Sequence, residues 1–164
     1  MDLVSFGCSW TWGVGLRYYR GMSCYDYNET KKDLECAETH SFRALLAKKY
    51  NLNPVKNFSI GASSNNRQFR QAEWYFTPNK DLSNTIILWG ITSTARYEVW
   101  RPNNQEYKSI MLTRPYTMEE TRKDPVARWV VNERDNFYDH EHEVQILYKK
   151  MCHWNEYFAL KGAK

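Results

Sequence analysis

The chain has 164 residues, a length that allows a single domain over residues 1–164 and excludes two complete catalytic domains. Charged residues make up 26% and hydrophobic residues 42% of the chain, and these globular proportions exclude an intrinsically disordered protein. Basic residues exceed acidic ones by only four and are scattered among them, so the charge permits a nucleic-acid partner but does not indicate one.

The first predicted element is a short buried strand at Leu3–Phe6, an apolar run that a glycine ends. These first residues lack a basic start and a long apolar region, so they indicate no secretory signal and we expect a cytoplasmic protein. The stretch Gly13–Glu38 has no periodic pattern and predicts a long surface loop. A helix capped by Thr39 or Ser41 follows and ends at Asn51.

A second strand is predicted at Val55–Ile60, followed by a helix that Ser63 or Ser64 caps and that ends near Phe76. A third strand is predicted at 85–89, where the longest apolar run is far below the roughly 20 residues of a membrane span. Helical patterns separate the strands, and this alternation predicts βαβ crossovers and a parallel sheet.

Beyond the third strand, the segments Tyr97–Arg101 and Tyr107–Leu112 flank a turn-like sequence and predict an inserted hairpin. Residues 117–136 are predicted to be partly helical, with an interruption at Pro125. The strongest helical pattern covers about residues 141–160, and a glycine two residues later is a suitable C-cap.

Each predicted strand ends in a glycine followed by small polar residues. The three segments are 7–13, 57–63 and 90–93. In an open parallel sheet, ligands bind at the carboxyl ends of the strands, so these segments are expected at one rim.

This rim carries a family resemblance. The motif Gly-x-Ser-x-Thr-x-Gly at residues 7–13 resembles the first block of the SGNH, or GDSL, hydrolases. Asn-x-x-x-Gly at 57–61 is similar to their second block, and Gly-x-Thr at 90–92 falls where their third block has Gly-x-Asn. The run 61–67 and the hairpin look more like phage-encoded SGNH-like proteins than like secreted esterases.

The resemblance covers most of residues 1–100 and implies an α/β fold: a flavodoxin-like three-layer α/β/α domain with a parallel sheet of strand order 2-1-3. It also implies a serine hydrolase acting on acyl or acetyl esters, including carbohydrate esters, without a cofactor. Ser9 is then the nucleophile, and the amides of Ser9 and Gly61 are oxyanion donors. Thr92 stands where the family has an Asn side chain as third donor.

The resemblance leaves two alternatives for the general base that activates the serine. SGNH enzymes keep an Asp-x-x-His pair near the C-terminus, after the last strand. Asp139 and His142 have that spacing, but they precede the long helix and follow only three predicted strands. We therefore expect either that this pair is the dyad, or that the chain is truncated before its last strands and has lost the dyad. A third interpretation is that these residues have no catalytic role and form the solvent-exposed start of a helix.

Five residues near the motifs are expected to contact substrate: Trp10, Trp12, Asn65, Asn66 and Arg67. The aromatic rings could stack on a sugar or acyl group, or simply pack in the core. Four arginines form either a basic rim that attracts anionic substrates or a set of solvated charges. They are Arg67, Arg70, Arg96 and Arg101.

Neither metal nor disulfide chemistry is expected. The four cysteines show no CxxC pair and no zinc-finger spacing, so free thiols are expected in a reducing compartment. His140 and His142 would point apart on a helix, and no third ligand is evident.

Two functional classes lead, ahead of nucleic-acid binding, which only the mildly basic composition suggests. The first is an SGNH-like serine ester hydrolase, and the second is a catalytically inactive SGNH scaffold of viral origin that binds or assembles. If the sheet ends at the third strand, this strand forms a long apolar edge without a neighbour, and such an edge associates with other chains. We therefore also expect a homo-oligomer that pairs through that edge or through the long helix.

Overall fold

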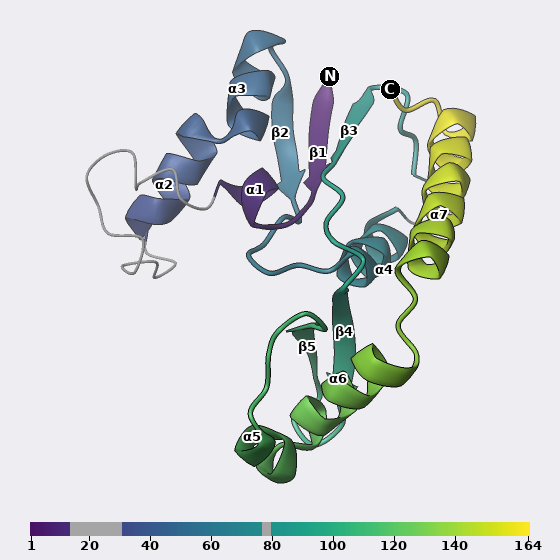
Figure 1. Ribbon diagram of the computed structural model, residues 1–164. Helices are drawn as coiled ribbons and strands as arrows, with labels where there is room; N and C mark the ends of the chain where they lie inside the picture. Colours follow the sequence, from purple (N-terminus) through teal and green to yellow (C-terminus); the bar gives the residue numbers. More distant parts are fainter. Residues whose placement is uncertain (14–30, 77–79) are drawn as a thin grey trace.

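The computed structural model describes residues 1–13, 31–76 and 80–164. Its centre is a parallel sheet of β1 (Asp2–Phe6), β2 (Asn53–Asn57) and β3 (Thr85–Trp89) in the order β2-β1-β3 (Figure 1). The parallel pairing and the 2-1-3 order confirm the prediction. The fold is therefore mixed α/β, with β1 as the central strand.

The second strand begins and ends earlier than its apolar pattern predicted. β2 starts at Asn53 and contains Pro54, which an edge strand tolerates because the proline nitrogen is not needed in the ladder. Beyond the end of β2, the Phe58 amide still donates to the Ser5 carbonyl at 2.7 Å. The polar start of β2 explains the misplaced boundary.

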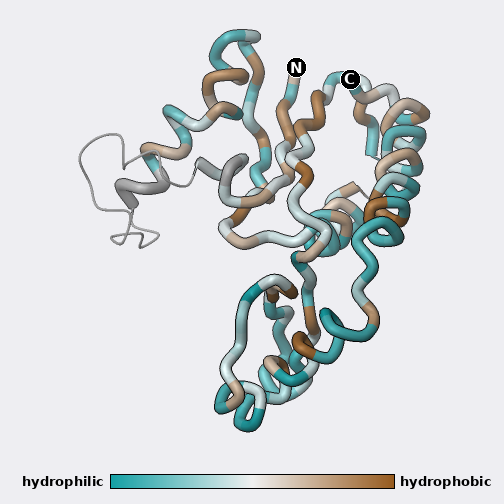
Figure 2. The backbone as a smooth tube through the Cα atoms, viewed as in Figure 1, coloured by the Kyte–Doolittle hydropathy of each residue, from teal (hydrophilic) through white to brown (hydrophobic). Residues whose placement is uncertain are grey.

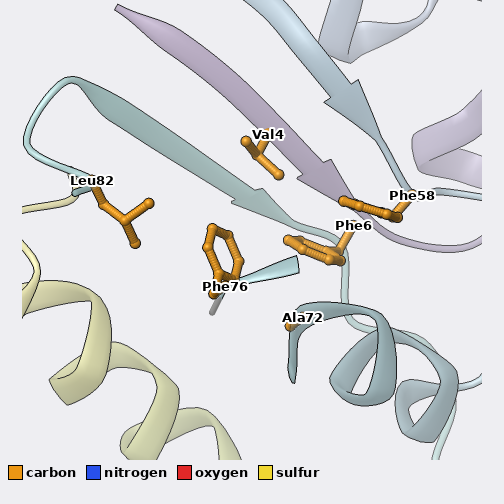
Figure 3. Close-up of a cluster of buried hydrophobic side chains, with 6 residues drawn as sticks. All are labelled: Val4, Phe6, Phe58, Ala72, Phe76 and Leu82. Atoms are coloured by element: carbon orange, nitrogen blue, oxygen red, sulfur yellow. The ribbon is translucent and has the colours of Figure 1, made fainter. Parts of the chain in front are cut away.

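The two faces of the sheet bury different side chains because successive residues of a strand point to opposite faces. On one face, Leu3 packs with Ala47 and Leu52. On the other face, Val4 and Phe6 join a cluster from α4 and the segments beside it (Figure 3). Helices thus cover both faces, and Figure 2 shows hydrophobic segments along β1 and β3 in the centre.

In the described part of the segment between β1 and β2, the chain forms three helices: α1 (Ser9–Trp12), α2 (Lys31–His40) and α3 (Phe42–Lys49). Ser41 caps α3 by accepting a hydrogen bond from the Ala44 amide. The prediction of a loop up to Glu38 was wrong over α2, and the rest of that predicted loop, 14–30, lies outside the described residues. Ala37 is the one buried residue among the described side chains of α2, so the helix has little apolar pattern.

The helix α4 (Asn65–Tyr75) connects β2 to β3, and Ser64 caps it by accepting from the Arg67 amide. It packs its buried stripe toward the sheet, where Ala72 is fully buried. This crossover confirms the predicted helix and its cap.

A hairpin of β4 (Arg96–Arg101) and β5 (Glu106–Met111) follows β3, as predicted. The helices α5 (Met118–Lys123) and α6 (Pro125–Asn136) meet at Asp124, which ends the first and caps the second. A second small core joins the hairpin to α6. Its buried members are Ala95, Ile110, Leu112 and Val130.

The last helix, α7 (His140–Leu160), returns along the sheet, and Trp154, Tyr157 and Phe158 pack against the core that contains Val4 and Phe6. Beyond α7, the Lys164 amide donates to the Thr85 carbonyl at 2.9 Å, and the Ile87 amide donates to the Lys164 carbonyl at 3.2 Å. The main chain of Lys164 therefore runs beside β3. Among the described residues, no helix is long and apolar enough to cross a membrane.

Candidate functional site

The loops after β1 and β3 are held together by Thr11, which is buried. A Cβ built on Gly7 or on Gly90 would lie 2.1 Å from the Thr11 Oγ1 atom. The Gly90 amide also donates to the Phe6 carbonyl at 2.9 Å. The two glycines therefore provide the space in which the candidate serine loop packs against the end of β3.

Ser9 is the first residue of α1 and is partly buried. Its carbonyl accepts a hydrogen bond from the Gly13 amide at 2.9 Å, and Gly13 has a φ of 104°, which favours glycine. A first helical residue has no carbonyl within its helix to which its amide could donate. Among the described residues, the Ser9 hydroxyl has no hydrogen-bond partner.

Gly61 lies in a tight turn after β2. The Ile60 amide donates to the Gly7 carbonyl at 3.4 Å, and the Ser63 amide donates to the Ile60 carbonyl at 3.3 Å. Within the described ranges, the Gly61 amide makes no backbone hydrogen bond. Both amides that the resemblance assigns to the oxyanion site thus follow adjacent strands and are not used in backbone pairing there.

Asn57 orders the approach to this turn. Its Oδ1 atom accepts from the Ser5 hydroxyl at 2.9 Å and from the Ser59 amide at 3.0 Å. The first residue of the Asn-x-x-x-Gly motif therefore links β1 to the segment that leads to Gly61. Asn57 therefore positions the turn that contains Gly61, because its Oδ1 atom accepts hydrogen bonds both from β1 and from the segment after β2.

Thr92 is held by Asn65 across the gap between β3 and α4. The Asn65 Nδ2 group donates to the Thr92 carbonyl, and the Thr92 amide donates to the Asn65 Oδ1 atom, both at 2.9 Å. Asn65 is buried, so these bonds occupy its amide in a site that water reaches poorly. Sequence reasoning missed this contact because the partners are 27 residues apart and leave no local signal.

The other residues expected to contact substrate differ in how far their side chains are exposed to solvent. Arg67 donates from Nη1 to the Phe58 carbonyl at 3.0 Å, and burial lowers the pKa of its guanidinium, with Glu98 acting in the opposite direction. Trp12 is buried, and Asn66 is exposed. The Trp10 side chain lies outside the described part. Substrate binding by these residues stays a prediction.

Asp139 and His142 lie at the start of α7. The Asp139 Oδ1 atom accepts from the Glu141 amide at 2.9 Å and from the His142 amide at 3.3 Å, so the carboxylate caps the helix. The His142 side chain is exposed. Figure 1 shows α1 beside β2 and the start of α7 beyond α4, well apart in this view. No described contact joins the expected dyad to Ser9.

The neighbouring His140 is the histidine of this segment with side-chain partners. Its Nδ1 atom lies 3.1 Å from the Tyr138 hydroxyl and 3.2 Å from the Thr94 hydroxyl. These contacts tie the start of α7 to the loop before β4. Within the described residues, no group of three or more metal-binding side chains is present.

Comparisons with protein-family models, with curated proteins and with solved structures found no match to this chain. Its function therefore has to be inferred from its own residues and their arrangement.

Proposed function

We propose that the chain is an SGNH-like serine ester hydrolase that acts on acyl or acetyl esters, including esters of carbohydrates. One observation carries the proposal: Ser9 lies in the segment that follows the central strand of a β2-β1-β3 parallel sheet, and Gly61 and Thr92 follow the two flanking strands. The carboxyl ends of parallel strands share one edge of a sheet, where α/β proteins bind their ligands.

In this mechanism, the Ser9 hydroxyl oxygen attacks the ester carbonyl carbon while a base takes its proton. The amides of Ser9 and Gly61 donate hydrogen bonds to the oxygen that becomes negative, and the Thr92 hydroxyl is the third donor. Collapse of the intermediate expels the alcohol, which receives the proton. Water then hydrolyses the acyl-serine and releases the acid. The candidate dyad is Asp139 and His142.

A second function is favoured by the surroundings of Asp139 and of Ser9. The Asp139 carboxylate accepts hydrogen bonds from the α7 backbone, and the described residues provide no partner for the Ser9 hydroxyl. A serine without a base is a poor nucleophile. The second candidate is therefore an inactive SGNH-like scaffold of viral origin that binds a glycan or serves in assembly.

Labelling with a fluorophosphonate probe, followed by turnover of p-nitrophenyl acetate, separates the two functions. For the hydrolase, we expect labelling of the wild-type protein and of Ser83→Ala, and none of Ser9→Ala. Turnover by Ser9→Ala should fall by about 10³-fold or more. Ser83 is an exposed serine just before β3, at the opposite end of the strand, and is the matched control.

The labelling results test the activity, the nucleophile and the base separately. A wild-type protein that the probe does not label is the inactive scaffold, and labelling that persists in Ser9→Ala removes Ser9 from the nucleophile role. If His142 is the base, His142→Ala should abolish labelling while His140→Ala retains it. Equal labelling of both histidine variants would contradict the Asp139 and His142 dyad.

A further inference from the structure

The four arginines of the expected basic rim have different surroundings. Arg67 donates to the Phe58 carbonyl. Arg70 makes a two-bond contact with Glu98, at 3.1 and 2.9 Å, and its guanidinium lies 4.1 Å from the Tyr107 ring centroid. In Arg96, by contrast, the Nε and Nη1 atoms are buried and have no hydrogen-bond partner. Arg96 is therefore a half-buried cation with two buried donors that have no acceptor.

Arg96 lines a pocket of about 260 Å³ between the hairpin and the helices α5 and α6. Two other cationic side chains, Lys108 and Arg114, line the same pocket, and so does Ser109. The pocket also includes Ala62, the neighbour of Gly61, so it extends to the turn after β2. A basic pocket therefore lies beside the proposed ester site, on residues that the proposed mechanism does not use.

The two acidic residues of this pocket already have partners. Glu120 pairs with Arg114 at 3.2 Å and accepts from the Thr117 amide and hydroxyl; these hydrogen bonds hold its pKa below the usual range. The Asp124 Oδ1 atom accepts from the Val126 amide at 2.8 Å.

Glu98, on the same strand as Arg96, is held by the two bonds from Arg70. Within the described residues, neither Arg96 nor Lys108 is paired with an acid. Three cationic side chains (Arg96, Lys108 and Arg114) and two carboxylates (Glu120 and Asp124) line the pocket, so it keeps a net positive charge.

We propose that this pocket binds a small anion that carries a phosphate or carboxylate group, with Arg96 as its main ligand and Lys108 and Ser109 at its rim. Buried guanidinium donors without an acceptor are unfavourable, and an oxyanion satisfies such donors through charge-assisted hydrogen bonds. The volume is below the usual range for drug-sized ligands, which fits a small anion. The proposal does not depend on hydrolase activity.

Isothermal titration calorimetry with inorganic phosphate and with succinate, at fixed ionic strength, tests the site. We expect the wild-type protein to bind at least one of the two anions, and Arg96→Gln to weaken that binding by about tenfold or more. Arg101→Gln removes the same charge from the far end of β4, outside the pocket, and should change the affinity by less than about twofold.

Lys108→Gln is the second variant because Lys108 is exposed and its loss should not affect folding. It should weaken binding by a few-fold, and it tests the site even if Arg96→Gln does not fold. Absence of binding of both anions to the wild-type protein overturns the proposal, as does unchanged affinity in Lys108→Gln and a folded Arg96→Gln. Ser9→Ala should bind the anion normally, which separates this proposal from the ester hydrolase.

Discussion

Thr11 occupies the space that Gly7 and Gly90 leave open at the carboxyl ends of β1 and β3. A Cβ on Gly7 would lie 2.1 Å from Thr11 Oγ1 and 2.3 Å from Thr11 Cβ. A Cβ on Gly90 would meet the same Oγ1 at 2.1 Å, but its next contacts are at 3.5 Å, an ordinary separation. The two glycines therefore differ in which atoms of Thr11 exclude a larger residue.

This difference predicts a selective rescue. Gly7→Ala and Gly90→Ala should each lower the free energy of unfolding, by about 1–3 kcal/mol, because a methyl group is forced into a packed site. Thr11→Ala removes Oγ1 but leaves Cβ, so it should relieve the clash in the Gly90→Ala double variant and not in the Gly7→Ala one. Urea unfolding of the single and double variants measures both couplings. Equal coupling in the two cycles would contradict this packing.

At the scale of elements, α4 is joined to the segment after β3 by polar contacts. Asn65 bonds the main chain of Thr92 twice, and Arg70 reaches across to Glu98 on β4. These contacts run from the first turns of α4 to the start of the hairpin. They place the loop that carries Thr92 relative to the helix that follows Gly61.

Asn65→Ala should lower the free energy of unfolding by about 1–3 kcal/mol, because it leaves the Thr92 amide and carbonyl without their partner. Asn66→Ala is the matched control: it removes the same side chain from the next, exposed position and should change stability by less than about 0.5 kcal/mol. Chemical denaturation of both variants measures the difference. Equal effects would show that the Asn65 contacts contribute nothing specific.

The sequence predicts those parts of the fold that local patterns determine. The cap at Ser64, the break at Pro125 and the strand at 85–89 each follow from a few neighbouring residues. The helix α2 was missed because the burial of one alanine leaves too weak a pattern, and β2 was misplaced because its first residues are polar and contain a proline.

The candidate site was less predictable because its contacts are not local. The motifs correctly indicated the segments that follow the three strands, since glycine and small polar residues mark strand ends. The Asn65 contact with Thr92 and the unpartnered donors of Arg96 depend on where distant segments pack. The sequence pattern of four arginines cannot distinguish Arg67 and Arg70, which bond neighbouring residues, from Arg96, which has buried donors without an acceptor.

At the scale of the whole molecule, the outer edge of β3 is only partly covered. The main chain of Lys164 pairs with Thr85 and Ile87 on this outer edge. Successive residues of a strand direct their backbone groups to opposite sides, so every second amide of β3 points toward β1 instead, as the Gly90 amide does. The Ile87 carbonyl and the Trp89 amide therefore face outward, and neither makes a backbone hydrogen bond with another described residue. An edge of this kind pairs readily with another chain.

We therefore expect a homo-oligomer that pairs through the β3 edge of a second copy. Light scattering over a range of protein concentrations should give a mass above that of the 164-residue monomer. Tyr148→Lys, on the exposed side of α7, and the control Tyr50→Lys, on the exposed end of α3, should both retain this mass because neither lies on the edge. Dissociation by Tyr148→Lys alone would assign the interface to α7, and a monomer at every concentration would exclude self-association through β3.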